Sequence, residues 1–146
     1  MSQTMTIDIK VYGKIDMREF LLALENYGWT FNDNGQINYL PLGDEDFDWE
    51  RVSLSKKQDV LSIIVKKIAA KEMIGIVMTW QDSMIGGNFL YMPERFTLSF
   101  SASINRQKLK NDPYDRFTSI DWYYSKILRG LSDCRIDIQG VQIDDF

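Results

Sequence analysis

The segment Gly43–Glu50 holds the densest group of side chains that could do chemistry in this chain of 146 residues. Five of its residues are carboxylates, and two aromatic rings stand among them. Asp44, Asp46 and Asp48 have the spacing of the first ligands in an EF-hand calcium loop, but that loop also needs glycine at position six and glutamate at position twelve. Trp49 and Ser55 occupy these positions. The segment therefore predicts no metal site, and we expect no cofactor.

The usual catalytic side chains are nearly missing. The chain has no histidine and one cysteine, so acid–base chemistry would depend on carboxylates, lysine, tyrosine or Cys134. Cys134 has no histidine to activate it, which favours a structural thiol. We expect no catalytic residues and a protein that is not an enzyme. A hydrolase built on two carboxylates is an alternative, and it would need one raised pKa and a fixed spacing between the two groups.

The acidic segment instead predicts a surface that binds a basic protein. Residues 1–50 carry ten acidic and three basic side chains, and this segment is their densest part. Aromatic rings are favoured anchors at interfaces. We expect partner contacts from Asp44, Glu45, Asp46, Phe47, Asp48, Trp49 and Glu50. Two other interpretations stay open: a solvated loop without a function, and aromatic rings that fix the loop to the core.

Charge and composition limit the partners and the compartment. Residues 51–111 carry ten basic and four acidic side chains, but the sequence pI of about 4.8 argues against direct contact with nucleic acid. The longest apolar stretch, around Met73–Trp80, is far shorter than the roughly 20 residues of a membrane helix. A single cysteine and an amino terminus without signal-peptide features favour the cytoplasm.

The hydrophobic pattern predicts alternating groups of strands and helices. Alternation predicts strands at residues 5–12 and 96–104. A largely apolar run predicts a strand at residues 73–80, and a short strand should follow at residues 88–92. Asp16 with Glu19 predicts a capped helix that ends at Gly28. Two more helices should begin near Ser53 or Ser55 and near Thr118 or Ser119, and a last strand should begin near residue 135.

Some of the predictions concern single positions. A hairpin should pair Trp29 and Phe31 with Ile37 and Tyr39 across an Asn-Gly turn, and a second turn should span residues 81–87. The inward positions expected on the second and third helices are Val60, Leu61, Ile64, Val65, Ile68, Ile120, Tyr124, Ile127, Leu128 and Leu131, with lysines over the rest of the second helix and Trp122 or Tyr123 at a rim. The whole pattern predicts one α+β domain over residues 1–146, in which a single antiparallel sheet carries about three helices, mainly on one face.

The chain resembles the small α+β immunity proteins that bacteria encode beside polymorphic toxins. The resemblance covers roughly residues 75–130 and lies in Trp80-x-Asp82 running into Ile85-Gly86-Gly87, in the strand Phe96–Ile104 ending in Asn105-Arg106, and in Trp122-Tyr123 with Ile127. Such proteins bind a toxin domain, often a nuclease, and block its active site without chemistry. The resemblance transfers no contact residues.

These observations together predict a non-enzymatic protein that neutralises a basic partner, namely the toxin domain that an immunity protein blocks. One alternative is an inhibitor encoded by a phage or mobile element that acts on a host defence protein by the same physics. Another is a homodimer formed through an edge of the sheet.

Overall fold

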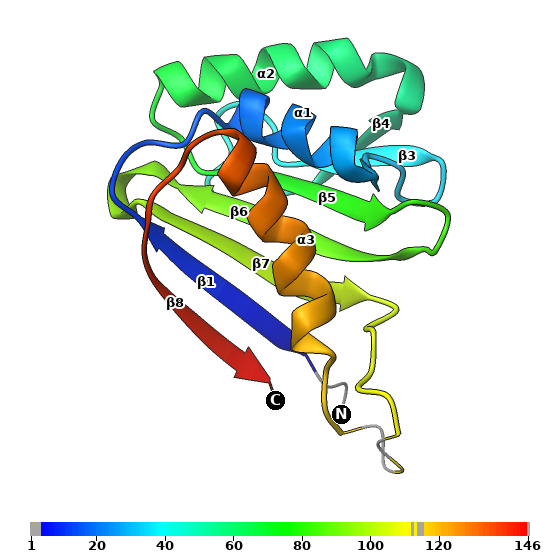
Figure 1. Cartoon of the computed structure of the whole chain (residues 1–146). Coiled ribbons are helices and arrows are strands. Elements are labelled where there is room, and N and C mark those ends of the chain that lie inside the picture. Colours follow the sequence, from blue (N-terminus) through cyan, green and yellow to red (C-terminus); the bar gives the residue numbers. More distant parts are fainter. Residues whose placement is uncertain (1–3, 112, 114–115, 146) are drawn as a thin grey trace.

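The computed structural model describes residues 4–111, 113 and 116–145. The first three residues, part of the segment in which no signal peptide is expected, lie outside this range. Figure 1 shows one sheet with helices lying across it. The elements in chain order are β1 (Met5–Val11), α1 (Met17–Tyr27), β2 (Trp29–Thr30), β3 (Gln36–Tyr39), β4 (Glu50–Ser53), the 3₁₀ turn η1 (Leu54–Lys56), α2 (Lys57–Ala69), β5 (Ile74–Trp80), β6 (Ile85–Met92), the 3₁₀ turn η2 (Pro93–Arg95), β7 (Thr97–Ile104), α3 (Ile120–Asp133) and β8 (Ile138–Asp145).

The strands form one sheet in the order β4-β3-β5-β6-β7-β1-β8, with β2 as a further partner of β5. All described pairings are antiparallel. The first strand, β1, lies inside the sheet between β7 and β8, and Figure 1 shows β8 and β1 side by side. The predicted α+β fold with a single antiparallel sheet is confirmed.

One face of the sheet carries the core. On β1, Met5, Ile7, Ile9 and Val11 are buried, and the residues between them point to the other face. The register places Ile7 opposite Phe100, so β7 continues the same apolar layer. The three helices cover this face, and their buried residues join a single cluster with those of the strands (Figure 1). Among the residues that the structure describes, no helix lies over the opposite face, which is called the open face below.

Rings meet edge to face in the middle of the core. Trp29 is 1% exposed and lies 5.6 to 5.9 Å, centroid to centroid, from the rings of Trp80, Phe89 and Phe100. Such T-shaped pairs add about 0.5–1.5 kcal/mol each beyond the area they bury. Tyr123 of α3 contacts Phe100 with the two rings tilted by 42° and is fully buried, whereas Tyr124 is only partly buried. The prediction that Trp122 or Tyr123 lies at a rim is therefore wrong for Tyr123.

The predicted caps of α1 are confirmed. The Asp16 carboxylate accepts a hydrogen bond from the backbone N–H of Glu19, and Gly28 ends the helix at φ 120°. The predicted hairpin is correct only in its turn. Asn34 and Gly35 have positive φ and are closed by Asp33 and Gln36, as in a two-residue turn. β2 and β3 do not pair with each other, because the longer buried strand β5 takes both as neighbours.

The second helix begins later than predicted. Glu50–Ser53 forms the edge strand β4 beside β3, and Ser53 caps the 3₁₀ turn rather than α2. Two positions on this helix are also corrected: Val65, expected in the buried stripe, is 47% exposed, and Lys67, expected outside the stripe, is 1% exposed. Lys67 is buried because its ammonium group has backbone carbonyls to bind, as described below.

The predicted turn over residues 81–87 is too long, because Gly86 and Gly87 belong to β6. A Cβ atom on Gly86 would stand 2.0 Å from the carbonyl oxygen of Met78, and one on Gly87 would stand 1.8 Å from that of Ser101. The glycines therefore permit a close approach of neighbouring strands at a register shift. Phe96, predicted within the buried alternation of β7, instead precedes that strand with φ 47° and is 39% exposed.

Candidate functional site

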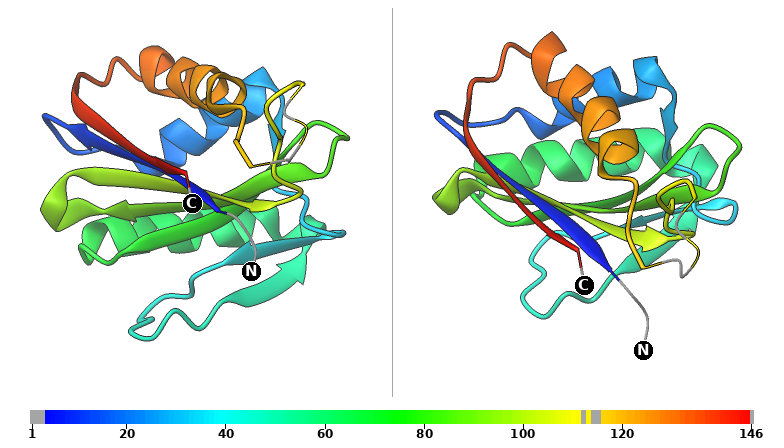
Figure 2. Two further views of the ribbon diagram at one scale, coloured as in Figure 1. Left: turned by 90° about the horizontal axis from the view of Figure 1, so that it is seen from below. Right: turned by 60° about the horizontal axis from the view of Figure 1, so that its bottom comes forward.

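The acidic segment Gly43–Glu50 joins β3 to β4 and folds back over the open face. The alternation of residues along β5 identifies the face on which the segment lies. Ile74 and Ile76 point to the helices, so Gly75 between them faces the open side of the sheet. A Cβ atom on Gly75 would stand 2.9 Å from the Trp49 ring and 2.6 Å from Leu40. Figure 2 shows this cyan-to-teal segment on the side of the sheet away from α1 and α3.

Several groups hold this loop in one conformation. The Asp44 carboxylate accepts hydrogen bonds from the backbone N–H groups of Phe47 (3.1 Å) and Asp48 (2.8 Å). At the start of the loop, the N–H of Gly43 donates to Glu72 Oε1 at 2.7 Å. Asp44 therefore organises the loop, as aspartate does in Asx turns. Asp44 therefore stabilises the conformation of the loop and also contributes to its surface charge.

A buried lysine supports the beginning of the same loop. Lys67 Nζ donates to the carbonyl oxygens of Leu40 (3.2 Å) and Pro41 (2.7 Å), and it lies 3.8 Å from Glu72 Oε1. Burial lowers the pKa of Lys67, and the nearby carboxylates of Glu72 and Asp44 act in the opposite direction. The chain thus keeps a cation beneath the densest acidic part of its surface.

The seven predicted partner-binding residues fall into two groups. Trp49 is partly buried on Gly75, Glu50 accepts a hydrogen bond from the Tyr39 hydroxyl at 3.2 Å, and Asp44 binds the loop backbone. Burial raises the pKa of Tyr39, and Glu50 raises it further. The second group consists of Glu45, Asp46, Phe47 and Asp48, all exposed at the end of the loop.

The second group forms a compact surface, called the loop tip below. Phe47 is 51% exposed and has φ 58°, a left-handed conformation that costs a non-glycine residue about 1–2 kcal/mol. Within the described residues, the carboxylates of Glu45, Asp46 and Asp48 make no hydrogen bond or ion pair. Leu42, 48% exposed, adds apolar area beside the tip. The arrangement presents one ring and three carboxylates to solvent.

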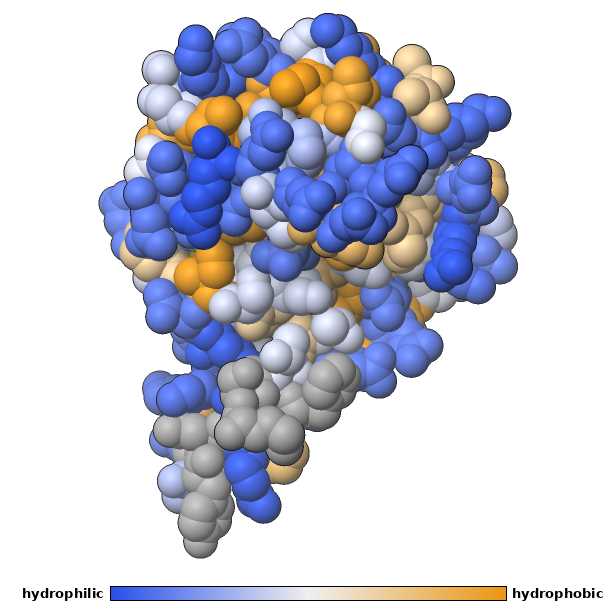
Figure 3. Space-filling model, turned by 180° about the vertical axis from the view of Figure 1, so that it is seen from behind, coloured by the Kyte–Doolittle hydropathy of each residue, from blue (hydrophilic) through white to orange (hydrophobic). Residues whose placement is uncertain are grey.

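The open face beyond the loop is polar and shallowly hollowed. Its residues on β7 are Thr97, Ser99, Ser101 and Ser103, with Asp8 and Lys10 on neighbouring β1. A cavity of about 800 Å³ lies over β1, β7 and β8, and a second of about 500 Å³ lies over Asn38, Arg51 and Asn88. Figure 3 shows the molecule from this side, where residues of intermediate hydropathy (pale) are flanked by strongly hydrophilic ones (blue). Alternation of serine with apolar residues in the sequence was the available signal for this face.

Cys134 and Lys126 lie in surroundings that favour a structural role over a catalytic one. Burial raises the pKa of Cys134, and Glu19, Asp133 and Asp16 raise it further, which disfavours the nucleophilic thiolate. Lys126 Nζ lies 4.2 Å from the Trp122 ring and 5.0 Å from the Trp80 ring. Over residues 4–111, 113 and 116–145, no group of three or more histidine, cysteine or acidic side chains is arranged to hold a metal ion.

Among the residues that the structure describes, no helix has both the length and the apolar character to cross a bilayer. Comparisons of the chain with protein-family models, with curated proteins and with solved structures find no match.

Proposed function

We propose that this protein is a non-enzymatic binding protein that neutralises a basic protein partner through the loop tip. The partner that fits the proposal best is a toxin domain of the nuclease type, with this chain acting as its immunity protein in the cytoplasm. The observation that carries the proposal is the exposure of Phe47 among three carboxylates that have no partner within the described residues.

Preorganisation supports this role. Exposed loops usually lose conformational freedom on binding, which costs affinity. Here Asp44 binds two backbone N–H groups of the loop, and Trp49 packs on Gly75. The tip is therefore held in position before any partner arrives, so less ordering is required on association.

Electrostatics supports a basic partner. A nuclease binds phosphate groups with a cationic surface, and neutralising that surface is a direct way to block it. The carboxylates of Glu45, Asp46 and Asp48 would accelerate encounter and pair with lysine or arginine of the partner. Phe47 would then supply the desolvated anchor that interfaces need at their centre.

Exposure of the acidic groups favours binding over hydrolysis. Carboxylate-based glycosidic chemistry needs one carboxyl group whose raised pKa comes from a desolvated site. The three carboxylates of the loop tip are exposed to solvent at the end of a surface loop. They suit steering and ion pairing better than general acid catalysis. The proposal includes no direct contact of this chain with nucleic acid.

The test begins with the partner. The tagged protein is used to capture proteins from the native cell, and the captured protein is identified together with the products of neighbouring genes. A basic toxin domain whose activity is inhibited by the pure protein supports the proposal. A host defence protein would instead favour the mobile-element inhibitor, and self-association alone in gel filtration would favour the homodimer.

The loop tip is then tested with the identified partner. Asp46→Asn with Asp48→Asn should weaken binding by at least about tenfold, because close interfacial charge pairs are worth roughly 1.5 kcal/mol or more. Phe47→Ala should weaken it by a similar factor. The matched controls are Asp82→Asn with Asp137→Asn and Tyr12→Ala, which change exposed residues elsewhere. Unchanged affinity in both loop variants would falsify the role of the loop tip.

A further inference from the structure

A separate cavity lies on the helix side of the sheet and is independent of the loop tip. It has a volume of about 310 Å³ and is lined by Lys14, Ile15, Ile68, Lys71, Ile74, Tyr91, Pro93, Glu94 and Phe96. These residues come from the segment before α1, the end of α2, the start of β5, and the region from β6 to η2. Four distant parts of the chain thus converge on one space.

The floor of this cavity is apolar. Ile15, Ile74 and Tyr91 are each no more than 2% exposed, and Ile68, Pro93 and Phe96 complete the walls. A volume near 300 Å³ is at the lower end of the range for small-molecule sites, which are mostly apolar with a few placed polar groups. The cavity therefore suits a compact apolar body, such as one aromatic ring.

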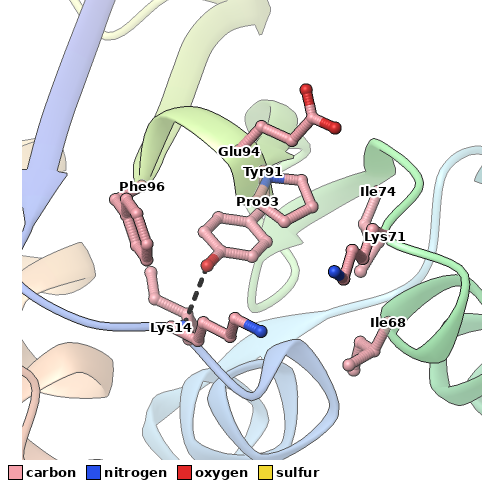
Figure 4. Close-up of a pocket in the computed structure, with 9 residues that line it drawn as sticks. Lys14, Ile68, Lys71, Ile74, Tyr91, Pro93, Glu94 and Phe96 are labelled. Carbon is pink, nitrogen blue, oxygen red and sulfur yellow. Dashed lines mark hydrogen bonds between the residues drawn. The ribbon is translucent and has the colours of Figure 1, made fainter.

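The mouth of the cavity is cationic. Figure 4 shows the amino groups of Lys14 and Lys71 directed at the same space beside Tyr91, whereas the carboxylate of Glu94 points away from it. Neither lysine forms an ion pair within the described residues. Two ammonium groups at the rim of an apolar cavity favour an anionic head group.

Tyr91 supplies a buried polar group at the same place. Its hydroxyl oxygen accepts a hydrogen bond from the Ile15 backbone N–H at 3.0 Å (Figure 4). Within the part of the chain that the structure describes, no acceptor is found for the hydroxyl proton, although the residue is 2% exposed. A buried hydroxyl normally uses its donor, so this proton is available to a ligand oxygen.

Two residues that line the cavity take their direction from the ends of helical segments. Lys71 (φ 58°) follows α2, where the N–H groups of Lys71 and Glu72 bind carbonyls of the last turn, and Phe96 (φ 47°) follows η2. These conformations aim the Lys71 side chain at the mouth and place the Phe96 ring on the wall.

We propose that this cavity is a binding site for a small amphipathic carboxylate, with an apolar body between Ile68, Ile74 and Phe96 and a carboxylate between Lys14 and Lys71. The site does not depend on the proposed partner, because the loop tip and this cavity lie on opposite faces of the sheet.

The test uses 3-phenylpropionate as the probe, with 3-phenylpropanamide as the neutral isostere and 3-phenylpropylamine as the cation. Binding to the full chain is followed by amide chemical shifts in NMR titrations up to 10 mM. The acid should bind at least about fivefold more tightly than the amide, because an ionised acceptor strengthens the hydrogen bonds to the lysines. The amine should bind most weakly of the three.

Surface variants make the test specific. Lys14→Gln with Lys71→Gln should remove the preference for the acid and leave amide binding unchanged, and Glu94→Gln should strengthen acid binding. Lys66→Gln is the matched control, since Lys66 is exposed on α2 and does not line the cavity. Ile68→Trp should fill the cavity and abolish binding of acid and amide alike. Equal binding of acid and amide, shifts that map elsewhere, or no binding of the acid at 10 mM each overturn the proposal.

Discussion

The ring of Trp49 lies so close to Gly75 that a Cβ atom on the glycine would stand 2.9 Å from the ring atom Cη2. This contact joins the acidic loop to the middle of the open face, since Gly75 belongs to β5 near the centre of the sheet. The loop tip is therefore carried by the sheet itself rather than by a flexible connection. The position of Phe47 and its neighbouring carboxylates depends on a residue that has no side chain.

Gly75→Ala should lower the free energy of unfolding by about 1–3 kcal/mol, because Leu40 and Trp49 must both move to admit the methyl group. It should also shift the fluorescence of Trp49 to longer wavelength as the ring loses its contact. Urea denaturation and emission spectra measure the two effects. Gly140→Ala is the control, since a Cβ atom there meets nothing within 4 Å. Equal stability of both variants would show that the ring does not rest on Gly75.

Gly86→Ala and Gly87→Ala should each cost about 3 kcal/mol or more, because the added methyl group would collide with backbone carbonyls that cannot rotate away. Thermal melting followed by circular dichroism measures the loss. Gly13→Ala, with open space around the new methyl group, should change little. A turn at residues 86–87, in place of the strand, would predict a mild effect for all three variants.

Lys67→Met should destabilise the fold by about 1–3 kcal/mol at pH 7, because the carbonyl groups of Leu40 and Pro41 lose their buried donor. The exposed neighbour Lys66 provides the control variant Lys66→Met, which should have little effect. Urea denaturation of the three proteins gives the comparison. Loss of order in the loop should appear as broadened amide signals of residues 43–48.

The stability difference between wild type and Lys67→Met should also change with pH. Burial lowers the pKa of Lys67 in the folded state, so the unfolded chain binds more protons between that pKa and the ordinary value near 10.5. The wild type therefore gains stability relative to the variant as pH rises from 7 towards 10. Parallel pH profiles of the two proteins would contradict the burial of a charged Lys67.

Cys134 should react slowly with a thiol reagent such as DTNB at pH 8. Burial and the carboxylates of Glu19, Asp133 and Asp16 raise its pKa, so a smaller fraction is thiolate than in the unfolded chain. Release of the coloured thiol is compared between native protein and protein in guanidinium chloride, with Cys134→Ser as the blank. Equal rates in the two conditions would mean that the thiol is neither buried nor held by those charges.

Local patterns predicted the elements whose residues repeat regularly. The alternation from Met5 to Val11 and the carboxylate of Asp16 before α1 report physics that acts within a few residues, and both were confirmed. The two-residue turn at Asn34 and Gly35 is of the same kind. One face for all three helices followed from the same patterns, because an antiparallel sheet buries one side.

Contacts between distant segments were not readable in the same way. The local sequence does not indicate that β2 pairs with β5 rather than with β3. The four residues of β4 are too few to show a clear hydrophobic alternation. Burial of Lys67 depends on the carbonyl groups of Leu40 and Pro41, which lie 27 and 26 residues away in the chain, respectively. A helical stripe places lysine outside unless such acceptors are known.

Charge and aromatic content predict the acidic segment as the candidate site, and its role in binding a partner stays a prediction. Its internal contacts could not be predicted from the sequence, because the hydrogen bonds of Asp44 and the contact of Trp49 with Gly75 depend on how the loop folds over β5. The cavity beside Lys14 and Lys71 could not be predicted from local sequence patterns, because its residues come from four separate parts of the sequence.

The place of β1 inside the sheet has a consequence for biosynthesis. This strand is synthesised before every other strand of the sheet, yet its two neighbours are β7 and β8, the last two of these strands to be synthesised. Pairing across such sequence separations is slow, because a large loop must close before any contact is gained. The apolar side chains of β1 therefore remain exposed to solvent until β7 and β8 have been synthesised and can pair with this strand. The folding yield should depend on chaperones that shield this strand during synthesis.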